Sequence, residues 1–263
     1  MKADLNLTFY REEKFKETPI GKIPEDWEVV KIGERKISKL VKSGSTPSKK
    51  RVDYWNGKIP FVTIGDMTKV EKYIYNTQNK ITEVALRESN IYLLPKDSIL
   101  LSMYGTIGKV AINKVPVTIS QNIAGIILNE GVDEEFLYYV LQKYSSQFKY
   151  AKIITLKHLD IKMVKNTKIP FVSFPEQKAI AHILSTVDEA IQKTNEIIAK
   201  TERLKKGLMQ ELLTKGIGHK EFKDTEIGRI PKEWDLAYLG IALQYNASKN
   251  PRSNFPISVR AQL

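Results

Sequence analysis

The residues best spaced for nuclease chemistry are Asp160, Glu176 and Lys178. A metal-dependent nuclease binds its divalent ion with an aspartate and an acidic-x-lysine pair beside the scissile phosphate. The signal is weak, because Glu12 and Lys14 satisfy the same short pattern in a chain rich in glutamate and lysine. A metal-dependent nuclease therefore remains an alternative interpretation.

Other catalytic motifs are missing from the sequence. A methyltransferase acting on an adenine amino group would need an Asp/Asn-Pro-Pro-aromatic loop, but the sequence has no Pro-Pro pair. GTIGKV at 105–110 lacks the spacing and the hydroxyl residue of a phosphate-binding loop. The chain has no cysteine, and its histidines lack metal-ligand spacing. Apart from the nuclease alternative, the sequence predicts no catalytic residue, metal or cofactor.

Several segments combine cations, hydroxyls, amides and aromatic rings, which suit a surface that binds phosphates and base edges. The richest is KLVKSGSTPSKKRVDYWNGK at 39–58, followed by GTIGK at 105–109, SQN at 120–122 and LKHLDIK at 156–162. Amides in SQN could pair with adenine. The alternatives are a solvated basic loop for the first segment and a turn or a strand cap for GTIGK and SQN. The predicted DNA-binding residues are Lys42, Ser43, Ser45, Thr46, Lys49, Lys50, Arg51, Tyr54, Trp55, Thr63, Tyr104, Thr106, Lys109, Gln121, Asn122, Lys157 and His158.

The overall charge favours a polyanionic partner. The chain of 263 residues carries 42 Lys plus Arg against 30 Asp plus Glu, a formal net charge of +12. A generally basic surface without such a partner is the alternative. We expect a soluble, cytoplasmic protein, because the sequence shows no signal peptide, no membrane-spanning apolar run and no cysteine.

The elements that must position these loops change in character along the chain. Between Trp27 and about Pro170, short runs rich in β-branched and aromatic residues predict strands, and 129–148 predicts a helix with Asp133 as its N-cap. We therefore expect a mixed α/β (α+β) domain over residues 1–174.

After Pro175 the sequence predicts one long helix over 175–218 with an apolar heptad stripe. Such a stripe needs a second long helix as its partner, so we expect coiled-coil pairing. The alternative is a helix that lies on its own domain. The predicted dimerisation residues are Ile183, Leu184, Val187, Ile191, Ile197, Ile198, Leu204, Leu208 and Leu212.

One phrase occurs twice in the chain. FKETPIGKIPEDWEVVKIG at 15–33 returns as FKDTEIGRIPKEWDLAYLG at 222–240, an offset of 207 residues. Such self-similarity indicates a repeating unit about as long as the offset. We therefore expect one full unit, followed over 219–263 by the start of a second.

Taken in order, WEVVKI, SGSTPS, YWNGKIPFVTIGD, GTIGKVAI, SQN, IPFV, PEQKAI and the heptad helix resemble the specificity subunit of type I restriction-modification enzymes. The resemblance covers nearly everything from Phe15 to Trp234. It implies a non-catalytic subunit with two DNA target recognition domains, each reading half of a split site. Each domain is followed by a long helix, and the antiparallel helices set the gap between half-sites. The implied partners are double-stranded DNA, modification subunits that dock on the helices and, through them, restriction subunits.

The chain departs from this pattern after Gly240, where the sequence does not match the residues after Gly33 and is too short for a second domain. We therefore expect a half-length form, natural or truncated. It should form an antiparallel homodimer that reads a palindromic split site. The segment 222–240 should compete with the partner's own segment 15–33 for the same place on the partner's recognition domain. A purely structural helical scaffold is a further alternative.

Overall fold

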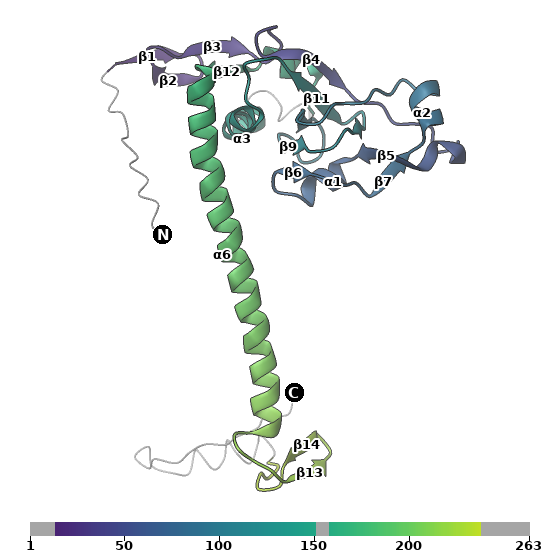
Figure 1. The fold of residues 1–263 in the computed structure, drawn as a ribbon, viewed down its shortest axis with the longest axis vertical. Helices are drawn as coiled ribbons and strands as arrows, with labels where there is room; N and C mark the ends of the chain where they lie inside the picture. The colour runs from purple at the N-terminus through teal and green to yellow at the C-terminus, as the bar shows by residue number, and fades with distance from the viewer. Residues whose placement is uncertain (1–13, 151–157, 238–263) are drawn as a thin grey trace. The chain divides into compact units, whose positions relative to one another are not determined.

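The computed structural model describes residues 14–150 and 158–237, without the side chains of 145–150 (Figure 1). The chain divides into two compact units, with the division between Asp188 and Glu189.

The first unit is built on a five-stranded sheet with the order β4-β11-β8-β9-β6. Neighbouring strands are antiparallel except for β6 and β9, which run parallel. The strands are β4 (Ser38–Ser43), β11 (Ile123–Leu128), β8 (Ile99–Ser102), β9 (Val110–Asn113) and β6 (Tyr73–Ile74). All residues of β8 and β9 are buried, as expected for central strands covered on both faces.

Helix α3 (Glu134–Tyr150) packs beside this sheet (Figure 1). The carboxylate of Asp133 accepts the Phe136 N–H at 2.9 Å, which satisfies one of the free donors at the helix start. Leu137 and Leu141 are fully buried in the same core as Leu101 and Ile112 of the sheet. The apolar stripe predicted at 129–148 therefore forms one wall of the main core.

A second, three-stranded sheet carries the loops that concern function. Its order is β10 (Thr118–Ile119), β5 (Trp55–Val62) and β7 (Asn79–Ile81). The pairing of β5 with β7 shifts between Trp55 and Ile59, which makes a bulge. The short helices beside it are η1 (Val52–Tyr54), α1 (Ile64–Thr68) and α2 (Glu83–Glu88).

Smaller elements connect the ends of the first unit. β1 (Phe15–Thr18) and β2 (Gly21–Pro24) form a hairpin, whereas β3 (Glu28–Lys31) pairs with the distant β12 (Lys168–Phe171). Helix α5 (Ile161–Asn166) directly precedes β12 in the chain. A Cβ at Gly33 would come within 2.9 Å of the Lys165 side chain, so this close approach favours glycine.

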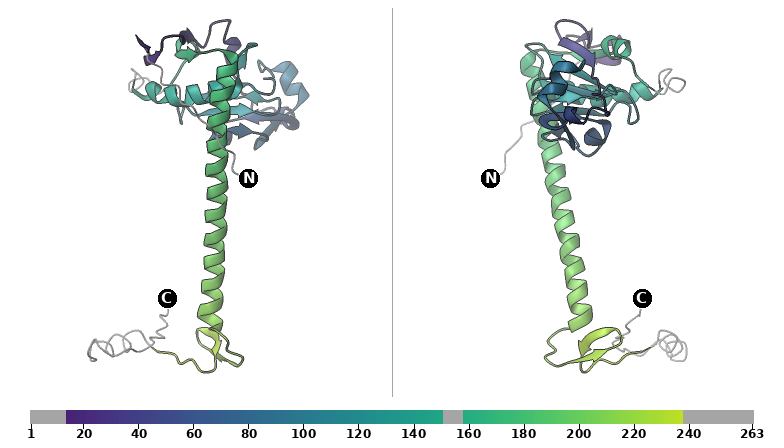
Figure 2. Two further views of the ribbon diagram at one scale, coloured as in Figure 1. Left: turned by 60° about the vertical axis from the view of Figure 1, so that its left-hand side comes forward. Right: turned by 90° about the vertical axis from the view of Figure 1, so that its right-hand side faces the viewer.

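Helix α6 runs without interruption from Phe174 to Lys215, as both views in Figure 2 show. Its 42 residues make a rod about 63 Å long at ~1.5 Å per residue. The helix ends before the predicted limit of 218, because Gly216 adopts a φ of 67° and the chain turns there.

A second hairpin follows in the other unit, formed by β13 (Phe222–Thr225) and β14 (Gly228–Pro231). It reproduces the first hairpin pair by pair: Phe15 faces Pro24 in one, and Phe222 faces Pro231 in the other. The threonine hydroxyl at each turn donates to the glycine carbonyl, at 2.5 Å in the first copy and 2.6 Å in the second. The sequence repeat is therefore also a structural repeat.

A mixed α/β domain followed by a long helix is confirmed. Among the described residues, no helix combines the length and apolar character needed to cross a membrane.

Candidate nucleic-acid interface

A cleft of about 650 Å³ opens where β5 meets the loops at 44–51 and 120–122. Its walls combine one cation with amides, hydroxyls and two aromatic rings. The lining residues are Thr46, Lys49, Trp55, Asn56, Phe61, Thr63, Ile64, Gly65, Asn79, Ser120, Gln121 and Asn122. Of the predicted DNA-binding residues, the structure brings together here Thr46, Lys49, Trp55, Thr63, Gln121 and Asn122.

Two loops far apart in sequence are joined at one end of the cleft. The Ser45 N–H donates to the Ile119 carbonyl at 3.1 Å, and the Gly44 N–H donates to the Ile123 carbonyl at the same distance. A Cβ at Gly44 would lie 2.0 Å from the Ile119 carbonyl oxygen, so only glycine allows this approach. The SGSTPS and SQN segments therefore form one rigid surface.

Trp55 contributes an aromatic wall to the cleft. Its ring meets Phe61 edge to face with centroids 5.5 Å apart, and its Nε1 donates to the Ser48 carbonyl at 3.2 Å. Asn56 lies on the bulge of β5 with a φ of 61°, in the left-handed region that asparagine tolerates better than most residues. Bulges of this kind often redirect side chains beside functional sites.

Ser120 lies between the two joined loops. It is only 7% exposed, and within the described residues its Oγ has no hydrogen-bond partner. Its N–H donates to the Val62 carbonyl at 3.0 Å, which fixes the backbone before Gln121. This backbone bond holds the start of the SQN segment against β5.

Two further predicted residues stack beside the cleft. The rings of Tyr104 and His158 are nearly parallel, at 2°, with centroids 5.0 Å apart. The residue before Tyr104 is Met103, whose N–H donates to the Asn122 carbonyl at 2.9 Å. The stacked pair is therefore tied to the cleft wall through the backbone.

Other predicted residues have partners within the protein. Arg51 donates two hydrogen bonds to Asp53, at 2.8 and 2.6 Å, and these raise the pKa of the guanidinium. Tyr54 is buried, and its hydroxyl donates to Glu88 at 3.0 Å; burial and this bond raise the pKa of the phenol.

The cations Lys42 and Lys109 also lie outside the cleft lining. Lys42 Nζ lies 5.0 Å from the centroid of the Tyr92 ring. Lys109 Nζ donates to the Glu71 carbonyl at 3.0 Å, and burial lowers the pKa of its ammonium group. Of the remaining predicted residues, Ser43 and Ser45 are half-buried, Lys50 and Thr106 are exposed, and Lys157 lies outside the described residues.

The nuclease triad does not form a separate site. Asp160 caps α5 by accepting the Met163 N–H at 2.7 Å, and Glu176 accepts from the Trp27 indole at 3.1 Å. Lys178 Nζ lies over the Phe174 ring, 4.6 Å from its centroid. Within the residues that the structure describes, no group of three or more acidic or histidine side chains could hold a metal.

Sequence reasoning missed Asn56, Phe61 and Asn79 as cleft residues. The Asn56-Gly57 dipeptide was a usable signal, since this pair favours a positive φ. Asn79 had no local signal, because only the pairing of β7 with β5 brings it to the cleft.

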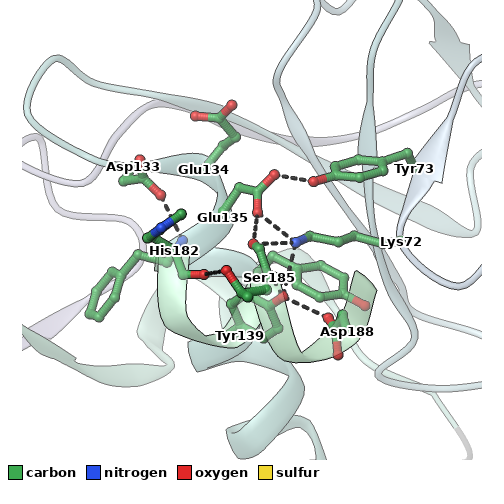
Figure 3. Close-up of polar contacts among 12 residues, drawn as sticks. Lys72, Tyr73, Asp133, Glu134, Glu135, Tyr139, His182, Ser185 and Asp188 are labelled. Carbon is green, nitrogen blue, oxygen red and sulfur yellow. Dashed lines mark hydrogen bonds and ion pairs between the residues drawn. The ribbon is translucent and has the colours of Figure 1, made fainter. Parts of the chain in front are cut away.

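The beginning of α6 is attached to the domain by a polar network (Figure 3). The Lys72 ammonium donates to Glu135 at 2.5 Å, to Tyr139 at 3.0 Å and to Ser185 of α6 at 3.1 Å. The Lys72 and Glu135 side chains are only 10% and 21% exposed. A buried lysine is thus paired with a partly buried glutamate beside the helix.

Hydroxyl groups complete this network. Tyr73 and Ser185 both donate to the Glu135 carboxylate, and Tyr139 donates to Asp188 at 2.6 Å. Burial alone raises the pKa of Glu135, but the hydrogen bonds from Lys72, Ser185 and Tyr73 outweigh it and lower the pKa overall. We call Lys72, Tyr73, Glu135, Tyr139, Ser185 and Asp188 the helix anchor.

Helix α6 also exposes an apolar stripe, which begins beside the anchor and continues past it. Ile191 is 53% exposed and Ile198 is 50% exposed. The other predicted dimerisation residues are exposed as well, except for Ile183, which is half-buried; they are Leu184, Val187, Ile197, Leu204, Leu208 and Leu212. Monomeric proteins seldom leave so long an apolar surface uncovered.

Comparison with known sequences gives one consistent family. A model of the type I restriction modification DNA specificity domain matches residues 24–203. The chain is 38% identical over 260 residues to the type I restriction enzyme MjaIX specificity subunit of Methanocaldococcus jannaschii, covering 93% of this chain and 58% of that protein. It is 30% identical over 201 residues to the EcoR124I/EcoR124II specificity subunit of Escherichia coli, covering 71% and 47%. The chain thus spans about half the length of the curated relatives it matches.

Solved structures share the fold. A type I R-M system structure, described for its complex assembly and conformational transition, gives a TM-score of 0.59 at 16% identity over 74% of this chain and 47% of the other. The HsdS subunit from Thermoanaerobacter tengcongensis gives 0.55 at 16% identity, over 75% and 47%.

Proposed function

Because this chain belongs to the type I restriction modification DNA specificity domain family, we propose that it is a non-catalytic subunit that recognises a half-site of a bipartite sequence in double-stranded DNA. The observation that carries this proposal is the cleft, where Lys49 lies with the amides of Asn56, Gln121 and Asn122. Cations bind phosphates and amides read base edges, so this set suits a nucleic acid.

We propose that the work is divided along the chain. Residues 1–174 form the target recognition domain, and the segment 175–218 contains the spacer and docking helix, which ends at Lys215. Residues 219–263 begin a second repeat, an assignment supported by the matched registers of the two hairpins.

The partners follow from this division. Modification subunits, which carry the methyltransferase chemistry in this family, dock on the long helix, and restriction subunits join through them. We also propose a cytoplasmic location, because the DNA specificity subunits of this family are typically cytoplasmic.

We propose that the exposed apolar stripe of α6 packs against the same helix of a second copy. We propose an antiparallel homodimer with two-fold symmetry, because a self-complementary surface closes in that way. Its two identical domains would read a palindromic split site.

Gel shift of the purified chain on duplex DNA tests the main proposal, with and without the modification subunit and with magnesium. We expect binding that weakens as salt rises and no cleavage. Cleavage by the chain alone would identify a nuclease, and absence of DNA binding in every condition would leave only the scaffold interpretation.

A further inference from the structure

We propose that Gln121 recognises an adenine of the half-site and that Thr46 is the positioning residue that fixes its amide. This inference rests on the proposed function and adds a specific residue and base to it. The deciding contact joins the two loops of the cleft: the Thr46 hydroxyl donates to Oε1 of Gln121.

Thr46 is itself held rigidly. It precedes Pro47, which is buried and restricts the backbone of the residue before it. On the other side, Gly44 and Ser45 are bonded to the backbone of Ile123 and Ile119. The hydroxyl of Thr46 is therefore fixed relative to the loop that carries Gln121.

The backbone of Gln121 is fixed as well. Ser120 donates to Val62 at 3.0 Å, and the Asn122 carbonyl accepts from Met103 at 2.9 Å. The Gln121 side chain is exposed in the cleft, with both of its neighbours in the chain tied to the sheet. Preorganisation of this kind reduces the entropy lost when a base binds.

The contact with Thr46 orients the amide and leaves a donor and an acceptor free for a base. One lone pair of Oε1 is used, which leaves a second lone pair and both Nε2 hydrogens. Phosphate oxygens only accept hydrogen bonds, so they cannot use the remaining acceptor. In the major groove, adenine presents the N7 acceptor beside the N6 donor, whereas guanine presents two acceptors. The Gln121 amide is therefore complementary to adenine.

Lys49 has a different role in the same cleft. The Lys49 ammonium can donate hydrogen bonds but cannot accept them. It therefore suits a phosphate and gives affinity without sequence preference. Gln121 and Lys49 should thus separate specificity from affinity when they are changed one at a time.

The test is selection of bound duplexes from a random pool, using the full chain with the modification subunit. Wild type should select an adenine that Gln121→Ala no longer selects, with about tenfold lost discrimination at that position. Thr46→Val should weaken the preference at the same position only. Gln78→Ala is the matched control, because Gln78 lies in the same domain outside the cleft lining.

A modified base gives the second measurement. Replacing the selected adenine by 7-deazaadenine removes the N7 acceptor, so wild-type affinity should fall about tenfold while Gln121→Ala is unaffected. If Gln121→Ala selects the same sequence as wild type, or if 7-deazaadenine lowers the affinity of both proteins equally, the adenine contact is overturned but the proposed function is not. If wild type binds no duplex, the proposed function fails and the inference with it.

Discussion

Lys49 and Arg51 lie two residues apart in the same basic loop, but their side chains have different partners. Arg51 is paired with Asp53 and Glu88 and lies over the Tyr54 ring, 4.3 Å from its centroid. Lys49 lines the cleft. A cation whose charge is already matched by carboxylates releases few DNA counterions, so only Lys49 should contribute to phosphate binding.

Changing Lys49 to Ala should therefore reduce the salt dependence of DNA binding. For one lost phosphate contact, the slope of log K against log salt should become shallower by about 0.9. The Arg51→Ala variant serves as the matched control and should keep the wild-type slope. Titrations of duplex DNA at several salt concentrations measure both slopes, and an equal change in the two variants would contradict this assignment.

The sequence predicted half of the residues that line the cleft. It could not show which basic side chains are already paired within the protein and which are available to DNA. Thr46, Gln121 and Asn122 stood out because hydroxyls and amides cluster in the segments SGSTPS and SQN. The pairing of Arg51 with Glu88 could not be predicted, since Glu88 comes from α2, which is distant in sequence. The same holds for Lys109 and the Glu71 carbonyl, because tertiary structure alone brings them together.

The helix anchor joins three elements of the domain, and it supplements the contacts that Glu176 and Gln177 make at the start of α6. Lys72 comes from the segment before β6, Glu135 and Tyr139 come from α3, and Ser185 comes from α6. Removing one partner of a buried ion pair leaves the other charge without compensation.

Glu135→Gln should lower the free energy of unfolding by about 3 kcal/mol at neutral pH. Because the folded-state pKa of Glu135 is depressed, its contribution is present above its ordinary value of 4.5 and is lost as pH falls through the depressed pKa. Urea unfolding from pH 7 to 3 should therefore show the two proteins converging in acid.

Glu130→Gln is the control for this experiment, because the Glu130 carboxylate is 94% exposed and its ion pair is with Lys39, which is also exposed. It should cost about 0.5 kcal/mol or less. A pH-independent difference between wild type and Glu135→Gln would show that the anchor does not act through this charge.

Local patterns predicted the larger elements well. The runs at β5, β8, β9, β11 and β12 were expected as strands, and the heptad stripe predicted α6. The short helices α1 and α2 were missed although each has a local signal: Thr63 and Asp66 form a capping box at α1, and Thr82 caps α2. β6 and β10 have two residues each and exist only through their neighbours, so no periodicity could reveal them.

In the whole molecule, the two hairpins mark the beginning of one sequence repeat and the beginning of the next. Both turn glycines adopt a positive φ, 103° at Gly21 and 109° at Gly228, and both copies bury the same isoleucine, Ile23 and Ile230. A tryptophan follows each hairpin at the same spacing. The backbone N–H of Trp27 donates to the Pro24 carbonyl at 3.2 Å, and that of Trp234 donates to the Pro231 carbonyl at 3.0 Å. One unit therefore extends from a hairpin through a domain and a helix to the next hairpin.

The proposed dimer depends on the apolar stripe of α6. Changing Ile191 and Ile198 to Glu should convert the dimer to a monomer, since two charges per helix would be buried at the seam. Gln192→Glu with Ala199→Glu is the matched control, because it adds the same charge one position further round the helix. Light scattering at micromolar concentration measures the mass.

The recognition domain should stay folded in both double variants, which circular dichroism and urea unfolding can check. A wild-type chain that is monomeric both alone and beside the modification subunit would rule out the homodimer.

The helix anchor also sets a mechanical tolerance. From Asp188 to Lys215, α6 extends about 40 Å as a continuous helix. A tilt of about 5° at its base would move the far end by about 3.4 Å, the rise of one base pair. To distinguish DNA sites whose two halves differ in separation by one base pair, the contacts at the base of the helix must resist tilts of about 5°. If the long helices of the proposed dimer set the separation of the two half-sites, the hydrogen bonds around Lys72 and Glu135 are among the contacts that limit the accuracy of that separation.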